Sequence, residues 1–293
     1  MGSHIHFNRL LDYRPLDQLS QMTDSDRHAL LTEIVGQPPS ENAWQAILEL
    51  FASWPDSESK SADLTWADAA LASWPDRVRF IYSSNDLLYE GRKLSMLARL
   101  VRSIEVYRRD ERASAELLAI ASSEYAIGLT YLIIRSSEIT SRAWQALVES
   151  PHLANVRHLH VTKSSLGAED VRRVFQSTRL QLTCLKLIDV GIHPQHLESV
   201  RDTMTLGKLC ALDLSSNGIG DEGVKILSAA GWLRQIQRLA LRDNFIGADA
   251  ARALLTSPFW ERIEEIDLTG NKLDAEKASL AALAAKKKIQ LIV

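Results

Sequence analysis

The chain has 293 residues, of which 46% are hydrophobic and 24% are charged, a composition typical of a globular protein with ample material for a core. The formal net charge of -3 argues against the basic surface with which most nucleic-acid-binding proteins hold phosphates, so we expect no nucleic-acid partner. No apolar run approaches the roughly 20 residues that a membrane-spanning helix needs, so we expect no membrane partner.

The N-terminal residues and the cysteines give information about the cellular compartment of the protein. The segment MGSHIHFNRLLDYRPL lacks the basic start and apolar centre of a secretory signal, and MGSH resembles a remnant of an expression vector. The chain has two cysteines, Cys184 and Cys210, which fits a reducing compartment. We therefore expect a cytoplasmic protein.

The sequence pattern of residues 1–77 is typical of short amphipathic helices. Ser25 and Ser40 are suitable N-cap residues, and the segment QPPSEN between the two apolar runs that follow them predicts a turn. We expect this region to be a helical cap over the first strand of the segment that follows, because an uncapped end of a repeat array exposes apolar surface.

From residue 78 onward an apolar pattern recurs every 26 or 27 residues in its best copies. In its full form it reads apolar, two residues, apolar, one residue, apolar, two residues, Asn, one residue, apolar. Three full copies start at Leu209, Ile236 and Ile263. Three copies that keep the apolar frame without the asparagine start at Leu129, Val156 and Leu182. Weaker copies start at Val78 and Val101, and Ile289 and Ile292 of the final IQLIV repeat the first two positions once more.

This pattern resembles a leucine-rich repeat protein. The unit length and the helix-forming second halves, such as GIGDEGVKIL and FIGADAARALL, are similar to the ribonuclease-inhibitor-like class. The resemblance covers residues 78–293 and is best over 129–293. It implies an α/β solenoid with parallel strands on a concave face and helices on the convex face. It also implies a recognition or scaffolding role without a cofactor.

The recurring asparagine has a structural explanation. After each strand the chain must turn, which leaves backbone groups without partners in the sheet, and a buried amide side chain both donates and accepts hydrogen bonds. We therefore expect Asn217, Asn244 and Asn271 to form a stacked ladder that bonds the turns of their own and adjacent units, with no catalytic role.

The N-terminal segment carries a second resemblance. Residues 30–56 are similar to the repeat-companion domain, a short helical domain that precedes leucine-rich repeats in many bacterial proteins. The residues that match its outline are Pro38, Trp54, Pro55 and Asp56. The sequence departs from that family in having Ala-Ser-Trp in place of Ala-Asp-Trp and Trp44 in place of a mid-helix arginine. The resemblance implies a bacterial source.

The chain lacks the usual signatures of catalysis. It has no phosphate-binding glycine loop, no Gly-x-Ser-x-Gly, no His-Glu-x-x-His and no Cys-x-x-Cys, so we predict no catalytic residue and no enzyme activity.

One group of side chains has the chemistry of a metal site. Alternate residues of a strand share a face, so His158 and His160 point to the concave side, and Cys184 holds the position of His158 in the next unit. These three side chains are suitable zinc ligands that leave one position open. The other interpretation is ordinary exposed strand residues, and Lys163 and Lys186 nearby disfavour a cation. We predict no metal and no cofactor, and keep a metal-dependent enzyme subunit as an alternative.

The concave face is the predicted functional surface. Its first half is rich in aromatic, aliphatic, His and Arg side chains, and aromatic and Arg residues are enriched at protein interfaces. The residues expected to contact a protein or peptide partner are Tyr107, Tyr131, Ile133, Arg135, His158, His160, Lys186 and Ile188. We expect non-catalytic recognition, in a regulatory or sensing subunit. Two alternatives stay open: the N-terminal helices or residues 80–125 cover this patch, or the protein self-associates through strand edges or its KKKIQLIV terminus.

Overall fold

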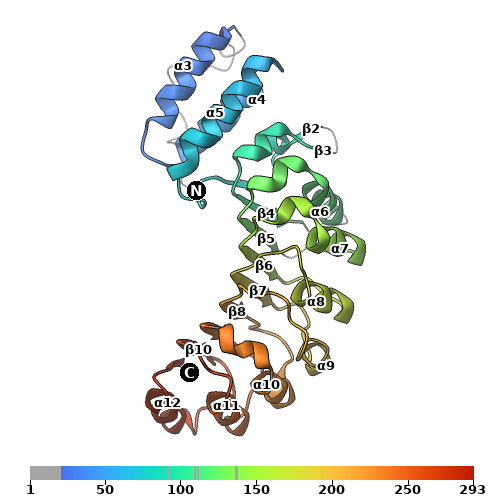
Figure 1. Cartoon of the computed structure of the whole chain (residues 1–293), viewed down its shortest axis with the longest axis vertical. Coiled ribbons are helices and arrows are strands. Elements are labelled where there is room, and N and C mark those ends of the chain that lie inside the picture. The colour runs from blue at the N-terminus through green and yellow to red at the C-terminus, as the bar shows by residue number, and fades with distance from the viewer. Residues whose placement is uncertain (1–20, 91–92, 109, 111, 136–137) are drawn as a thin grey trace, which may run out of the picture. The chain divides into compact units, whose positions relative to one another are not determined.

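The computed structural model describes residues 21–90, 93–108, 110, 112–135 and 138–293, so the MGSH segment and the start of the expected cap lie outside the described residues. The chain forms two compact units (Figure 1). The first consists of Met1–Ile104 and Ser123–Thr130, and the second of Glu105–Ser122 and Tyr131–Val293. The boundary predicted between residues 77 and 78 marks where the sequence repeats begin, whereas the two units are defined by compactness in space. The predicted boundary therefore stays a prediction.

The first unit begins with the expected helices. They are α3 (Asp24–Val35), α4 (Glu41–Ser53) and α5 (Glu58–Ala70). Ser40 caps α4 as predicted, but Thr23 rather than Ser25 caps α3. The reason is the capping box, which needs an acidic side chain three residues after the cap. Thr23 has Asp26 at that position, whereas Ser25 lies within the first turn.

The helices of the first unit are joined to its first strand. The elements that follow them are η1 (Leu71–Ser73), β1 (Phe80–Tyr82), η2 (Asp86–Leu88), β2 (Tyr89–Glu90), β3 (Lys93–Leu94), η3 (Met96–Leu100) and η4 (Glu124–Gly128). The indole nitrogen of buried Trp44 on α4 donates to the carbonyl of Phe80 on β1 at 2.7 Å. A helical segment therefore packs against the first strand, as a cap does.

A buried cation holds α5 to the following segments of this unit. Arg79 is 1% exposed, and its guanidinium donates to the Asp68 carboxylate at 2.5 Å and to the Leu100 carbonyl at 2.7 Å. Arg102 reaches the same carboxylate oxygen of Asp68 at 2.5 Å. Since a buried guanidinium needs most of its donors satisfied, this cluster fixes the end of the helical region.

The second unit is a parallel sheet with helices on one side (Figure 1). Its strands are the end of β4 (Ser103–Tyr107), then β5 (Tyr131–Arg135), β6 (His158–Thr162), β7 (Cys184–Ile188), β8 (Ala211–Asp213), β9 (Arg238–Ala240), β10 (Glu265–Asp267) and β11 (Gln290–Ile292). Its helices are α6 (Arg112–Ser122), α7 (Ser141–Glu149), α8 (Ala168–Phe175), α9 (Pro194–Glu198), α10 (Gly220–Ser228), α11 (Ala248–Leu255) and α12 (Lys277–Lys286), with η5 (Pro151–Leu153) and η6 (Gly231–Gln235). Strands and helices alternate along the chain, which is the α/β solenoid expected from the repeats. No helix in the described part of the chain has both the length and the apolar character to cross a bilayer.

The apolar frame of the repeats forms the core. Its strand residues are at most 2% exposed: Leu132, Ile134, Leu159, Val161, Leu185, Leu187, Leu212, Leu214, Leu239, Leu241, Ile266 and Leu268. Burial of each such side chain contributes about 1.5–3 kcal/mol. From β5 to β10 the pairing follows the predicted spacing, with Leu159 opposite Leu185 and Leu239 opposite Ile266.

The last strand departs from the predicted register by one residue. Leu291, and not Ile292, lies opposite Ile266, and Ile292 is 38% exposed. The chain reverses directly after α12 through Lys288, whose φ is 60°. This tight return shortens the last unit, and a shift of one residue moves each side chain of a strand to the opposite face.

The turn after each strand has a recurrent backbone conformation. At the equivalent position after five of the strands, one residue is left-handed, with φ between 52° and 76°: Lys163, Asp189, Ser216, Asp243 and Gly270. In the last three units this residue directly precedes the recurring asparagine. The chain leaves the strand at this residue, so the amides that follow need partners outside the sheet.

The asparagine side chains supply those partners. The Oδ1 atom of Asn217 accepts from the backbone amides of Val190 and Ile192 at 3.1 and 3.0 Å, one unit earlier. Asn244 Oδ1 accepts in the same way from Asn217 and Ile219, and Asn271 Oδ1 from Asn244 and Ile246. Their Nδ2 atoms donate to carbonyls of their own and the preceding unit. The three residues thus link four successive turns.

Candidate functional site

The second unit presents one face of its sheet away from the helices. On β5, β6 and β7 the burial alternates, so that Leu159 and Val161 are buried while His158 and His160 are half-buried. We call this surface the open face. The side chains that it presents are Tyr131, Ile133, Arg135, His158, His160, Thr162, Cys184, Lys186 and Ile188, with Tyr107 of β4 at 50% exposure. All eight residues predicted to contact a partner are on it.

The strand register arranges these side chains in rows across neighbouring strands. The rows are Tyr131, His158 and Cys184; Ile133, His160 and Lys186; and Arg135, Thr162 and Ile188. Within the first row the rings of Tyr131 and His158 are stacked, with centroids 4.0 Å apart and an interplanar angle of 1°. The ring of His160 meets both edge-on at 6.4 Å. The rings therefore hold one another in place on a rigid sheet.

Charges of both signs flank the aromatic rings. Arg135 pairs with Glu105 of the preceding strand at 3.0 Å, and its side chain is 54% exposed. Lys186 lies opposite Asp213 in the register. Farther along the sheet Arg242 lies 3.7 Å from Asp267. Because the pairs neutralise one another locally, the open face is not a strongly charged surface of one sign.

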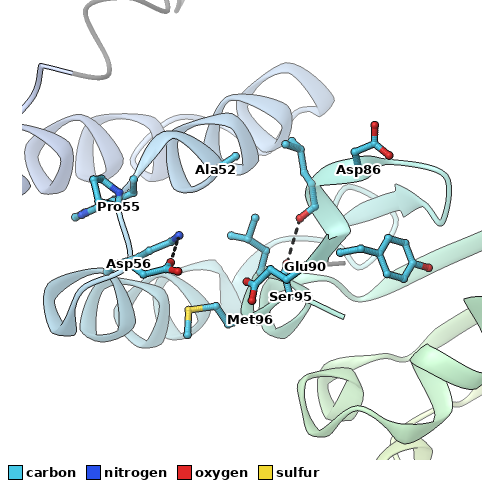
Figure 2. Close-up of a pocket in the computed structure, with 12 residues that line it drawn as sticks. Ala52, Pro55, Asp56, Asp86, Glu90, Ser95 and Met96 are labelled. Atoms are coloured by element: carbon cyan, nitrogen blue, oxygen red, sulfur yellow. Dashed lines mark hydrogen bonds and ion pairs between the residues drawn. The ribbon is translucent and has the colours of Figure 1, made fainter. Parts of the chain in front are cut away.

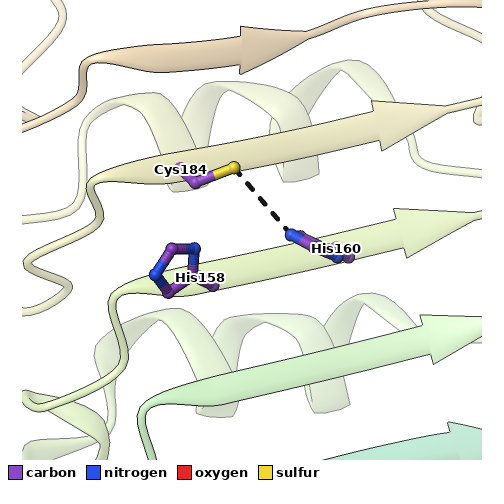
Figure 3. A group of neighbouring side chains, drawn as sticks. All are labelled: His158, His160 and Cys184. Atoms are coloured by element: carbon purple, nitrogen blue, oxygen red, sulfur yellow. Dashed lines mark hydrogen bonds between the residues drawn. The ribbon is translucent and has the colours of Figure 1, made fainter. Parts of the chain in front are cut away.

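His158, His160 and Cys184 converge on the open face. Figure 3 shows the two imidazoles on one strand and the thiol on the next, with a contact of 3.9 Å between Cys184 Sγ and His160 Nε2. One donor atom from each of the three residues lies within 4.8 Å of the others, and this is the group of potential metal ligands found among the described residues. The spacing of one strand predicted from the repeats is confirmed, since His158 pairs with Cys184.

Burial sets the protonation of this group. Burial, followed by the positive charge of Lys186, lowers the pKa of His160 to about 4, so its imidazole is neutral at pH 7. Burial also raises the pKa of the Cys184 thiol above its ordinary value. A protonated thiol beside a neutral imidazole is a poor nucleophile, because the thiolate is the reactive form.

A separate hollow lies in the first unit. Figure 2 shows it between the end of α4, the start of α5 and the segment formed by η2, β2 and the start of η3. Its volume is about 400 Å³. Among its lining residues, Lys60 pairs with Asp56 at 2.8 Å, and the Ser95 hydroxyl donates to the Leu87 carbonyl at 3.1 Å. No sequence motif predicts this hollow, because its lining comes from two separate segments, residues 52–60 and 86–97. Its lining lacks the rows of aromatic and cationic side chains that the open face presents, so it is a weaker candidate than the open face.

A comparison with protein-family models agrees with the repeat pattern in one unit. Residues 208–228 match a family model described as leucine rich repeat. No curated protein matches the chain. Among solved structures, an internalin from Listeria monocytogenes is similar over 67% of this chain and 48% of its own length, with 16% identity and a TM-score of 0.42. The chain thus spans about half of that protein. The family match lies on the third-last repeat, the unit that contains Asn217, and the units before and after it share its frame. Residues 208–228 therefore carry a leucine-rich repeat, and the fold of the second unit is a leucine-rich repeat solenoid.

Proposed function

We propose that the protein is a non-catalytic recognition module that binds a protein or peptide partner through its open face. The observation that carries the proposal is the set of rows on β5, β6 and β7, in which aromatic, aliphatic and cationic side chains are half-exposed and in register. The proposed contacts are Tyr107, Tyr131, Ile133, Arg135, His158, His160, Lys186 and Ile188.

The arrangement favours binding for energetic reasons. Aromatic and arginine side chains contribute most to interface affinity, and here they lie on a sheet instead of a loop. The stacked rings of Tyr131 and His158 are already ordered, so a partner does not have to immobilise them. Arg135, Glu105 and Lys186 place charges of both signs around the rings. They suit a partner segment that is apolar at its centre and carries acidic and basic residues at its ends.

The protonation states support recognition over nucleophilic catalysis. A cysteine–histidine pair is catalytic when the thiol is deprotonated by the imidazole. Burial acts in the opposite direction on both members here, raising the pKa of Cys184 and lowering that of His160. In the cell we place this module in the cytoplasm, as a regulatory or sensing subunit beside a separate effector, because Cys184 and Cys210 are both free thiols.

Site-specific photocrosslinking in the native host tests the proposal. A photoreactive amino acid replaces Tyr107 or Ile188 on the open face, and the matched controls replace exposed Arg142 on α7 or Lys225 on α10. We expect the same discrete adduct from both open-face positions and none from the helix-side positions. Mass spectrometry of the adduct then identifies the partner.

A second variant removes the surface without moving the probe. Tyr131→Ala/Arg135→Glu in the Tyr107-probe background abolishes the adduct if the rows form the contact, while Lys225→Glu leaves it unchanged. Circular dichroism and an unchanged unfolding midpoint show that each variant is folded. An adduct that persists in the double variant, or that forms only from α7 or α10, overturns recognition through the open face.

A further inference from the structure

Three side chains with the donor atoms that zinc prefers meet at one point of the open face. His158 and His160 provide imidazole nitrogens from β6, and Cys184 provides a sulfur from β7 (Figure 3). Histidine and cysteine are the two commonest ligands of zinc, and three protein ligands with one open position are typical of sites that exchange a fourth ligand. The chemistry of the donor set therefore selects a borderline-soft divalent cation over Mg²⁺ or Ca²⁺.

The distances are close to those of a tetrahedral site. Zinc bonds of about 2.0–2.1 Å to nitrogen and about 2.3 Å to sulfur place neighbouring ligand atoms roughly 3.3–3.6 Å apart. The distance between Cys184 Sγ and His160 Nε2 is 3.9 Å, and the widest separation within the group is at most 4.8 Å. Small rotations about the side-chain bonds close the remaining gap without movement of the strands.

Based on this convergence, we propose that the open face carries a binding site for one zinc-class divalent cation, with His158, His160 and Cys184 as its protein ligands. The site needs no partner protein, so a test of metal binding is independent of the proposed recognition function. Its fourth position faces away from the core, where water or a donor atom of a bound partner completes the coordination.

The surroundings order the ligands before the metal binds. The pairing of β6 with β7, in which His158 lies opposite Cys184, fixes the backbone spacing of the three residues. The ring of Tyr131 stacks on that of His158 and restricts its rotation. Restraint of this kind improves metal affinity because fewer conformations are lost on binding.

Some charged side chains near the site repel a cation, and acidic side chains beside them offset part of this repulsion. Lys186 and Arg135 repel a cation, although Arg135 is already paired with Glu105 and Lys186 lies opposite Asp213. Burial raises the pKa of the Cys184 thiol despite the nearby charge of Lys186, so a cation has to displace the thiol proton. On binding, the Cys184 thiol releases its proton to the buffer and the sulfur bonds the cation, so the bound charge falls from two to one.

Cobalt is the probe that separates this site from other histidines of the chain. The purified full-length chain is freed of metal with a chelator and titrated with Co²⁺, which gives a charge-transfer absorption only when a thiolate binds it. We expect the band to saturate at one equivalent and to disappear when Zn²⁺ displaces the cobalt. Binding at the histidines of residues 1–20 gives no such band because that segment has no cysteine.

The matched control uses the second cysteine. Cys184→Ser abolishes the band and Cys210→Ser retains it, while His158→Gln and His160→Gln each weaken binding at least about 10-fold. Circular dichroism verifies the fold of each variant, and Cys184→Ala serves as a second replacement if the serine variant is unstable. No thiolate band in the wild-type chain, or a band that survives in Cys184→Ser and is lost in Cys210→Ser, overturns the proposal.

Discussion

Replacement of Asn244 by alanine tests the asparagine ladder where it is most buried. Asn244 is 0% exposed, and its Oδ1 accepts from the backbone amides of Asn217 at 3.1 Å and Ile219 at 3.4 Å. Asn244→Ala removes the shared acceptor of both amides at once. The two carbonyls that receive its Nδ2 donors, those of Leu214 and Arg242, each keep another bond, from Asn217 Nδ2 and from the Ser216 amide.

The loss of stability in Asn244→Ala therefore comes from the backbone amides of Asn217 and Ile219, which lose their acceptor. A buried donor without an acceptor costs about 1–3 kcal/mol, and the longer bond of Ile219 contributes toward the lower end. We expect Asn244→Ala to lower the free energy of unfolding by about 3 kcal/mol. Asn271→Ala is the matched control, because Asn271 makes the same pair of bonds, at 2.9 and 3.0 Å, but is half-exposed. Water replaces its oxygen, so we expect a loss of about 1 kcal/mol.

Urea unfolding followed by far-ultraviolet circular dichroism measures both values. The slope of free energy against urea must be unchanged for the comparison to hold. Equal losses for Asn244→Ala and Asn271→Ala, or a loss below about 1 kcal/mol for Asn244→Ala, would refute the reasoning from buried amides.

Three further predictions concern single buried contacts, each measured by the unfolding midpoint in urea. Asp68→Ala leaves the buried Arg79 guanidinium without its carboxylate and should cost about 3 kcal/mol, with part of this recovered by the double variant Arg79→Met/Asp68→Ala; no recovery would contradict the role of an unpaired charge. Trp144→Phe removes an indole donor that bonds a backbone carbonyl at 2.7 Å in a fully buried site, for a loss of about 1–2 kcal/mol; a stability equal to wild type would show that the carbonyl finds another donor. Gly223→Ala places a methyl group 2.5 Å from the Ile219 side chain, so we expect a net loss of about 1 kcal/mol despite the better helix propensity, and a gain in stability would count against tight packing there.

Much of the candidate site follows from local rules. A strand alternates its faces with a period of two residues, so the repeat spacing alone placed His158 and His160 on one face and Cys184 beside them. The position of Tyr131 opposite His158 follows from the same 27-residue offset, whereas the stacking of their rings does not. The distances among the donor atoms of His158, His160 and Cys184 could not be predicted from the sequence, because side-chain rotations decide them. So were the pKa directions of His160 and Cys184, which depend on the burial around each group.

The sequence by itself determined the repeating unit of this protein, and with it the solenoid and the asparagine turns. It could do so because each unit buries its frame leucines against an identical neighbour, so one local pattern defines every contact between units. Where the repetition stops, tertiary packing decided the structure. The β2–β3 hairpin, the Arg79–Asp68 cluster and the shifted pairing of β11 each depend on contacts between segments that have no equivalent elsewhere in the chain. A periodic signal carries no information about such unique contacts, so only the folded structure shows them.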